Sequence, residues 1–206
     1  MREPSPMSYF RPCNALTYGS LLAGFLAALA AASRSGWHYA GALIAFCTLL
    51  DTFDGRFARL FPRSADQQAF GCHLDSLADA VVFGFVPVIC AARLIDFGAA
   101  GTGALVWWSA AAMVYLVATL TRLGCYNLHQ STSNHFVGIP TTLAALLLAA
   151  LFLMRPSARV TALALAACAV AMSTPIPVPR PRGAGMAAFV LSIVLIIVLH
   201  ILRAAS

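Results

Sequence analysis

Acidic side chains are concentrated in one short part of this sequence. Of the seven Asp and Glu residues among 206, five lie within 29 consecutive positions, where an even distribution would place one. Carboxylates held close together repel one another by about 4 kcal/mol per pair at an effective dielectric constant of ~20. Such a cluster is stabilised either by protonation or by bound cations. Its members are Asp51, Asp54, Asp66, Asp75 and Asp79.

The spacing of four of these acids places them on two helix faces. Asp51 and Asp54 are three residues apart, and Asp75 and Asp79 are four apart, so each pair shares one face of a helix. The two helices are consecutive and joined by a short loop, which makes them antiparallel neighbours. We therefore expect the four carboxylates to converge. Sites with only oxygen ligands select hard cations such as Mg²⁺, Mn²⁺ or Ca²⁺, and a divalent ion with open positions can bind phosphate oxygens of a substrate.

Glycine and arginine residues beside the acids favour a ligand that contains phosphate. Gly55 and Gly71 permit a ligand to approach the backbone closely. Arg56, Arg59 and Arg63 supply positive charge for phosphate groups. Each arginine taken alone is more typical of a membrane surface, and each aspartate taken alone is more typical of a solvated helix end. It is the combination of four spaced carboxylates with these neighbours that indicates a binding site.

The composition shows in what kind of protein these residues must be positioned. Hydrophobic residues make up 61% of the chain and charged residues only 10%, against an average near 25% charged in soluble proteins. This excludes a soluble globular domain, and it excludes a disordered chain, which needs low hydrophobicity and high charge. All 13 basic residues are Arg, and they occur without a basic run. The net charge of +6 therefore suits an anionic bilayer surface better than nucleic acid.

Hydropathy predicts an all-α polytopic membrane protein, a bundle of about seven transmembrane helices with six to eight as the range. We expect one membrane-embedded domain over residues 1–206. The second span is short and is predicted to continue as helix to Arg59, whereas the proline-rich stretch from Pro175 to Pro181 cannot be helical. The predicted spans are Ala15–Ser33, Trp37–Leu50, Leu74–Ile95, Gly103–Thr121, Phe136–Met154, Ala158–Ser173 and Ala184–Leu202.

The distribution of arginines predicts the orientation of the chain. With a cytoplasmic N-terminus, eight arginines lie inside and five outside, which agrees with the positive-inside rule. This orientation places the acidic cluster on the cytoplasmic side of the inner (cell) membrane. Arg180 and Arg182 are then expected to anchor the chain at the membrane surface.

The two acidic runs resemble the signature of the CDP-alcohol phosphotransferase family. That signature is D-x-x-D-G-x-x-A-R, a spacer, and then G-x-x-x-D-x-x-x-D. The run from Asp51 to Arg59 reads DTFDGRFAR, and the run from Gly71 to Asp79 reads GCHLDSLAD, so all eight fixed positions match. The resemblance implies a membrane enzyme that acts on a CDP-linked lipid.

Further segments are similar to one group within this family, the bacterial phosphatidylserine synthases. Leu74–Pro87, LDSLADAVVFGFVP, is similar to their Asp-Ser-Leu-Ala-Asp run and the Phe-Gly-x-x-Pro that follows. Asn14–Thr17 is similar to the start of their first span. Arg122-Leu123 with Asn127, and Phe136–Pro140, are similar to their Arg-Leu…Asn and Phe-x-Gly-Leu-Pro segments. The likeness runs from about residue 11 to 182.

This resemblance implies transfer of a phosphatidyl group from CDP-diacylglycerol to the hydroxyl of L-serine, giving phosphatidylserine and CMP. The alternative is the same chemistry with another acceptor: glycerol 3-phosphate, an inositol phosphate or choline. A transporter would distribute its acids over several separated spans, and an inactive family member would have lost one of the four aspartates. The resemblance also implies a homodimer among membrane lipids.

The resemblance assigns roles to individual residues. A divalent metal, Mg²⁺ or Mn²⁺, is expected at Asp51, Asp54, Asp75 and Asp79, and Asp79 is also expected to be the general base for the acceptor hydroxyl. Arg122 is the first candidate for binding the carboxylate of serine, because it lies at the end of an otherwise uncharged span. The weaker candidates are Arg63, Arg180 and Arg182. The residues expected to bind the cytidine diphosphate are Asn14, Thr17, Gly55, Ala58, Arg59 and Gly71.

The loop between the two runs departs from the family pattern. It has eleven residues between Arg59 and Gly71, more than is usual. A Ser or Thr that often contacts the nucleotide is replaced by Gln68. Ser64 is expected to substitute for it if the loop folds back.

Overall fold

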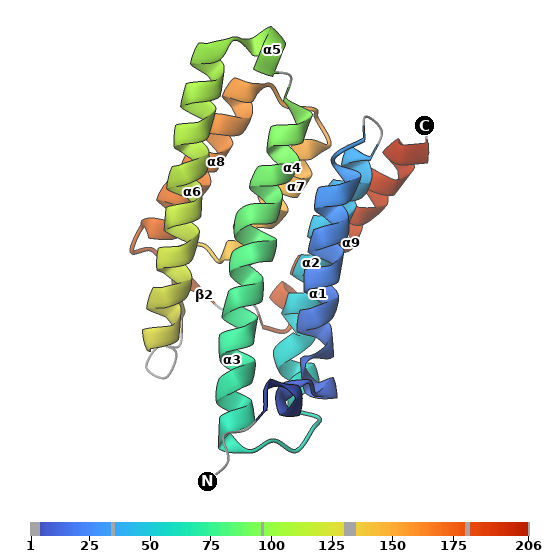
Figure 1. The fold of residues 1–206 in the computed structure, drawn as a ribbon, viewed down its shortest axis with the longest axis vertical. Coiled ribbons are helices and arrows are strands. Elements are labelled where there is room, and N and C mark those ends of the chain that lie inside the picture. The colour runs from blue at the N-terminus through green and yellow to red at the C-terminus, as the bar shows by residue number, and fades with distance from the viewer. Residues whose placement is uncertain (1–4, 34–35, 96, 130–134, 180–181, 206) are drawn as a thin grey trace.

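The computed structural model describes residues 5–33, 36–95, 97–129, 135–179 and 182–205. Within these residues the chain is almost entirely helical, and the helices run side by side in one bundle (Figure 1). The elements are η1 (Pro6–Tyr9), η2 (Pro12–Asn14), α1 (Ala15–Ala30), α2 (Trp37–Ala58), α3 (Ala65–Asp79), η3 (Ala80–Phe85), α4 (Val86–Leu94), α5 (Phe97–Ala100), α6 (Thr102–His129), β1 (His135–Val137), α7 (Thr141–Phe152), α8 (Ala158–Ser173), β2 (Pro177–Pro179) and α9 (Ala184–Ala205).

The bundle confirms the predicted all-α membrane architecture of about seven helices. Within the described ranges, four helical runs are long and apolar enough to cross a membrane: Pro12–Ala30, Ala65–Leu94, Thr102–Leu128 and Ala184–Ala205. α7 and α8 are apolar but have only 12 and 16 residues. At 1.5 Å per residue they are about 18 and 24 Å long, shorter than a hydrocarbon core of about 30 Å. The chain is an integral membrane protein whose helices differ in length.

The helix that carries the second acidic run begins earlier than the predicted span. Hydropathy placed the start of that span at Leu74, whereas α3 begins at Ala65. The Ser64 hydroxyl accepts a hydrogen bond from the Gln67 amide, and the Gln67 side chain accepts one from the Ser64 amide. This reciprocal capping box starts a helix on polar residues that a hydropathy window passes over.

The fifth span begins later than predicted. Hydropathy placed its start at Phe136, whereas α7 begins at Thr141, directly after Pro140. Phe136 instead belongs to β1, which pairs antiparallel with β2 opposite Val178. The proline-rich stretch is extended over Pro177–Pro179, and residues 175–179, the part of it that the structure describes, are not helical. α2 continues as helix to Ala58, one residue short of the predicted Arg59.

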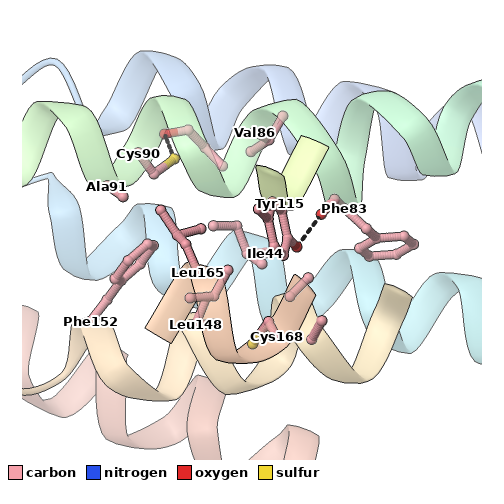
Figure 2. Packing of buried hydrophobic residues seen from close by; sticks show 14 of the residues in the cluster. Ile44, Phe83, Val86, Cys90, Ala91, Tyr115, Leu148, Phe152, Leu165 and Cys168 are labelled. Carbon is pink, nitrogen blue, oxygen red and sulfur yellow. Dashed lines mark hydrogen bonds between the residues drawn. The ribbon is translucent and has the colours of Figure 1, made fainter. Parts of the chain in front are cut away.

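The core lies where α1, α2, η3, α4, α6, α7 and α8 meet, and Figure 2 shows part of it. α3 passes through the π-helical segment η3 into α4 without a break in the helical run. Pro87 has no N–H to donate to the carbonyl of Phe83 four residues earlier. The Tyr115 hydroxyl of α6 donates to that carbonyl at 2.6 Å, and the Tyr115 side chain is fully buried. This bond fixes α6 against the helix that follows Asp79.

The bundle has two distinguishable ends (Figure 1). α2 ends and α3 begins at the lower end of the view, which we call the acidic end because the second half of α2 and the length of α3 carry the acidic runs. α5 and the C-terminus of the chain lie at the upper end, which we call the opposite end. α6 connects the two, running from Thr102 at the opposite end toward the acidic end.

Candidate active site

The last turns of α2 and the second half of α3 bring the four aspartates together. Ligand oxygens of Asp51, Asp54 and Asp75 all lie within 4.8 Å of one another, and the three side chains are half-buried. The carboxyl group of Asp79 is in hydrogen-bonding contact with that of Asp51. The antiparallel arrangement of two consecutive helices, expected from the spacing of the acids, produces this convergence.

The donor set fits a hard divalent cation. Three carboxylates can each offer an oxygen to one ion at this separation, and hard cations prefer oxygen ligands. In the part of the chain that the structure describes, no His or Cys joins this group. The aspartates can therefore bind a divalent metal ion, which would offset their mutual repulsion.

A polar cavity of about 260 Å³ lies between α1, α2 and α3, beside the aspartates. We call it the α1–α3 cavity. All six residues predicted to bind the nucleotide line it, together with two of the aspartates. The lining residues are Cys13, Asn14, Thr17, Asp54, Gly55, Ala58, Arg59, Arg63, Gln68, Gly71, Cys72 and Asp75.

The two glycines of the motif keep this cavity open. A Cβ atom placed on Gly55 would meet nothing within 4 Å. One placed on Gly71 would lie 3.5 Å from Asn14 Oδ1 and 3.8 Å from an Arg63 nitrogen, which is ordinary van der Waals contact. Both positions would tolerate a methyl group sterically. The glycines therefore leave room for a ligand; the packing of the helices does not require them.

Polar groups at the rim of the α1–α3 cavity have distinct local roles. Asn14 is buried, and its side chain donates to the Tyr9 carbonyl at 3.4 Å instead of capping α1. Ser64 is occupied in capping α3, so it does not substitute for the nucleotide-contacting residue of the family pattern. Gln68, one turn into α3, lines the cavity at that place.

A second, larger cavity of about 740 Å³ reaches the aspartates from the other side of α2. We call it the α2–α9 cavity. It shares Asp54, Gly55 and Arg59 with the first cavity. The remaining lining residues come from five elements and the segments beside them: Asp51, Thr52, Arg56, Tyr126, Pro140, Thr142, Leu143, Val178, Arg182, Gly185, Met186 and Phe189.

Arg122 lies close to the aspartates but does not line either cavity. It is half-buried on α6, it donates to the Gly138 carbonyl at 3.4 Å, and it interacts electrostatically with Asp79. Tyr126, one helical turn further along α6, does line the α2–α9 cavity. Arg122 and Tyr126 are four residues apart and therefore share one face of α6, so this spacing could have identified Tyr126 from the sequence.

Arg182 lines the α2–α9 cavity in the structure. The sequence favoured membrane-surface anchoring for Arg182 over binding of the acceptor, because nothing in a linear sequence places the start of α9 beside the end of α2. The companion expectation for Arg180 lies outside the described residues. Arg182 therefore adds a further positive side chain to a cavity that Arg56 and Arg59 also line.

The carbonyl that Arg122 contacts is held by a short ribbon. Gly138 has φ +71°, and a Cβ atom there would collide with the carbonyl of Met172. Its N–H donates to the Ile176 carbonyl at 2.8 Å, just beyond the β1–β2 pairing. Glycine is required here by both conformation and space. The ribbon thereby ties the segment before α7 to the segment after α8.

Comparison with known proteins agrees with this geometry. Over 145 residues the chain is 32% identical to a CDP-diacylglycerol–serine O-phosphatidyltransferase of Bacillus subtilis, covering 70% of this chain and 76% of that protein. Proteins of the same name from Helicobacter pylori (29% over 143 residues) and Mycobacterium tuberculosis (32% over 149 residues) are also similar. The matched regions cover 68% and 69% of this chain, but only 56% and 49% of those two proteins, about half their length.

The family signature covers most of the chain. Residues 11–175 match the CDP-alcohol phosphatidyltransferase family. This range contains both acidic runs, the Arg122 region and the segment that leads into α7. By the extent of this match, together with the converged aspartates, the chain belongs to the CDP-alcohol phosphatidyltransferase family.

Proposed function

We propose that this protein transfers the phosphatidyl group of CDP-diacylglycerol to the hydroxyl of L-serine, producing phosphatidylserine and CMP. The observation that carries the proposal is the convergence of four motif aspartates beside a cavity lined by all six residues expected to bind the nucleotide. The names of the similar proteins favour serine as the acceptor. One membrane-embedded domain over residues 1–206 performs this reaction.

The α1–α3 cavity receives the cytidine diphosphate part of the lipid. Gly55 and Gly71 leave open wall against which a ligand can approach the backbone. Arg59 lines both cavities and binds a phosphate group where they meet. Asn14 and Thr17, at the start of α1, present polar groups to the cytidine.

The aspartates hold the metal ion of the reaction, Mg²⁺ or Mn²⁺. When bound, such an ion neutralises charge on the diphosphate and on the departing CMP. Asp51, Asp54 and Asp75 supply the oxygens that lie within 4.8 Å of one another. Asp79 adjoins Asp51 and extends the set to four.

Asp79 accepts the proton of the serine hydroxyl. The serine oxygen forms a bond to the phosphorus that carries diacylglycerol, the bond from that phosphorus to the bridging oxygen breaks, and CMP leaves with the electron pair. Asp79 sits one turn beyond Asp75 on α3, so a hydroxyl that approaches from the α6 side meets it beside the diphosphate. Arg122 lies near enough to Asp79 to interact with it electrostatically.

The α6 side of the site binds the acceptor. Arg122 has a planar guanidinium that can bind the serine carboxylate with two hydrogen bonds, and its place beside Asp79 would bring the serine hydroxyl to the base. Arg182 on the wall of the α2–α9 cavity is the second candidate. The enzyme works as a homodimer among membrane lipids, with the active site on the cytoplasmic side of the cell membrane, as the excess of arginines at that end favours.

An acceptor panel tests the proposed function. Purified protein is incubated with CDP-diacylglycerol, Mg²⁺ or Mn²⁺, and one of serine, glycerol 3-phosphate, inositol phosphate or choline, while CMP release and the lipid product are measured. We expect product from serine alone and none with excess EDTA. Product from a different alcohol would replace serine as the acceptor and leave the family chemistry in place. No CMP release with any acceptor would overturn the proposal.

A further inference from the structure

A groove outside the active site runs between α6 and α8 at the opposite end of the bundle. The two helices lie side by side (Figure 1), and the groove between them has a volume of about 680 Å³, within the usual range of small-molecule sites. Small side chains form its floor. The lining residues are Gly103, Ala104, Trp107, Ala111, Ala158, Arg159, Ala162, Leu163 and Ala166.

The groove is about as deep as one leaflet of a bilayer. On α6 it extends from Gly103 to Ala111, and on α8 from Ala158 to Ala166. Each stretch rises about 12 Å, close to half of a hydrocarbon core of about 30 Å. Trp107 and Leu163 at its edge are 76% and 71% exposed. In a membrane protein, apolar side chains this exposed face lipid.

The charge at the mouth of the groove is positive. Arg159 in the first turn of α8 is its only charged lining residue. No hydrogen bond or ion pair joins its guanidinium to another residue in the part of the chain described here. The N-terminus of α8 adds the positive end of a helix dipole at the same place. An anionic group is the complementary partner.

The groove and the active site lie toward opposite ends of the bundle. From Ala104 at the groove to Tyr126 at the α2–α9 cavity, α6 rises about 33 Å, the thickness of a hydrocarbon core. A second copy of this chain is a poor occupant. In a symmetric dimer the same patch meets itself, which would bring two Arg159 side chains together without an acid in the groove lining to offset them.

We infer that this groove binds an anionic glycerophospholipid from the leaflet opposite the active site. One acyl chain lies along the alanines of α6 and α8, and the phosphate is bound by Arg159. This lipid is not the substrate, because its phosphate is held at the opposite end of the bundle from the aspartates. The site does not depend on the proposed reaction.

Quenching of Trp107 by brominated lipids tests this site without turnover. The full-length protein is reconstituted in phosphatidylcholine bilayers with rising mole fractions of brominated phosphatidylglycerol or, separately, brominated phosphatidylcholine. Subtracting the signal of Trp107→Phe isolates the fluorescence of Trp107. We expect phosphatidylglycerol to reach half-maximal quenching at about fivefold lower mole fraction, the preference that one arginine at an anionic surface supports.

Two variants and one control test the binding of the lipid headgroup and of the acyl chain separately. Arg159→Gln should reduce the preference to near unity, whereas Arg93→Gln, an exposed arginine in the last turn of α4 outside the groove lining, should retain it. Ala162→Phe fills the groove and should weaken quenching by both lipids. Equal quenching by the two lipids in the parent protein, or an unchanged preference in Arg159→Gln, overturns the inference. Quenching of Trp107 by neither lipid also overturns it and assigns the groove to a subunit contact.

Discussion

At the acidic end of the bundle polar side chains border open space, whereas in the ring cluster around Trp37 at the opposite end they pack against one another. The four aspartates adjoin two cavities. At the other end the rings of Trp37 and His38 lie 3.5 Å apart between centroids, and the His38 and His200 rings lie 5.8 Å apart. Arg155 stacks on Trp37 at 4.7 Å. The aspartate region is built to receive a ligand, whereas the cluster around Trp37 joins helices.

The glycines of the two regions differ in what surrounds them. Gly41 of α2 is covered by the ring of His200, which a Cβ atom would overlap. His200 is fully buried, and its Nε2 lies 2.9 Å from the Ala149 carbonyl, so this ring links α9 to both α2 and α7. At Gly55 the equivalent space is empty, and at Gly71 a Cβ atom would meet only ordinary van der Waals contacts. The same residue type therefore serves close helix packing at one end and ligand access at the other, and only the neighbours distinguish the two uses.

The largest effect expected at the acidic end is loss of the metal site. Asp51→Asn, Asp54→Asn and Asp75→Asn should each abolish CMP release while the protein remains folded in detergent, because each removes one of three oxygens that share a site. Asp66→Asn is the matched control, since Asp66 is exposed in the first turn of α3 and lines neither cavity. Near-normal turnover in any of the three variants would contradict the metal assignment.

Replacing the proposed base should have the next largest effect. Asp79→Asn should lower turnover roughly 10²–10⁴-fold, the usual contribution of general acid–base catalysis. Binding of CDP-diacylglycerol in the presence of Mg²⁺ or Mn²⁺ should persist, which a lipid-binding assay measures beside the rate of CMP release. If binding collapses as completely as in Asp51→Asn, Asp79 is a metal ligand before it is a base.

Variants of Arg122 test whether the α6 side of the site binds the serine carboxylate. Arg122→Ala should cost about 2–5 kcal/mol in the specificity constant for serine, because it removes the partner of a partly buried carboxylate. Arg122→Lys keeps the charge but loses the planar fork, so it should raise the Michaelis constant for serine more than that for CDP-diacylglycerol. The measurement is a serine titration at saturating CDP-diacylglycerol. Arg182→Gln is run in parallel, and an effect on serine in this variant alone would transfer the role to Arg182.

A pair of glycine variants tests the contrast between the two ends directly. Gly41→Ala should lower the midpoint of thermal unfolding, since overpacking costs about 1–3 kcal/mol, and it should leave the Michaelis constants of the folded fraction unchanged. Gly71→Ala should raise the Michaelis constant for CDP-diacylglycerol several-fold without loss of stability, because its methyl group meets only ordinary contacts. Equal destabilisation by both substitutions would show that the glycines at the two ends have the same packing role.

Local patterns were sufficient to predict the aspartate cluster. The i, i+3 spacing of Asp51 and Asp54 and the i, i+4 spacing of Asp75 and Asp79 are properties of single helices, and a short connection makes consecutive helices antiparallel. Hydropathy likewise predicted the number of helices. It misplaced the starts of α3 and α7, because a capping box and a proline decide those starts and neither is hydrophobic.

The sequence by itself determined the membrane class, the helices, the motif and the residues around the α1–α3 cavity, because these depend on composition and on neighbours within or between consecutive elements. Only the tertiary structure decided what lies opposite the motif. Tyr126 of α6 and Arg182, just before α9, reach the α2–α9 cavity from positions more than 60 residues beyond Asp54. Gly138 is fixed by pairing between the segments before α7 and after α8. Such contacts arise from the packing of elements that are not consecutive in the chain. The spacing of residues along the sequence does not predict that packing.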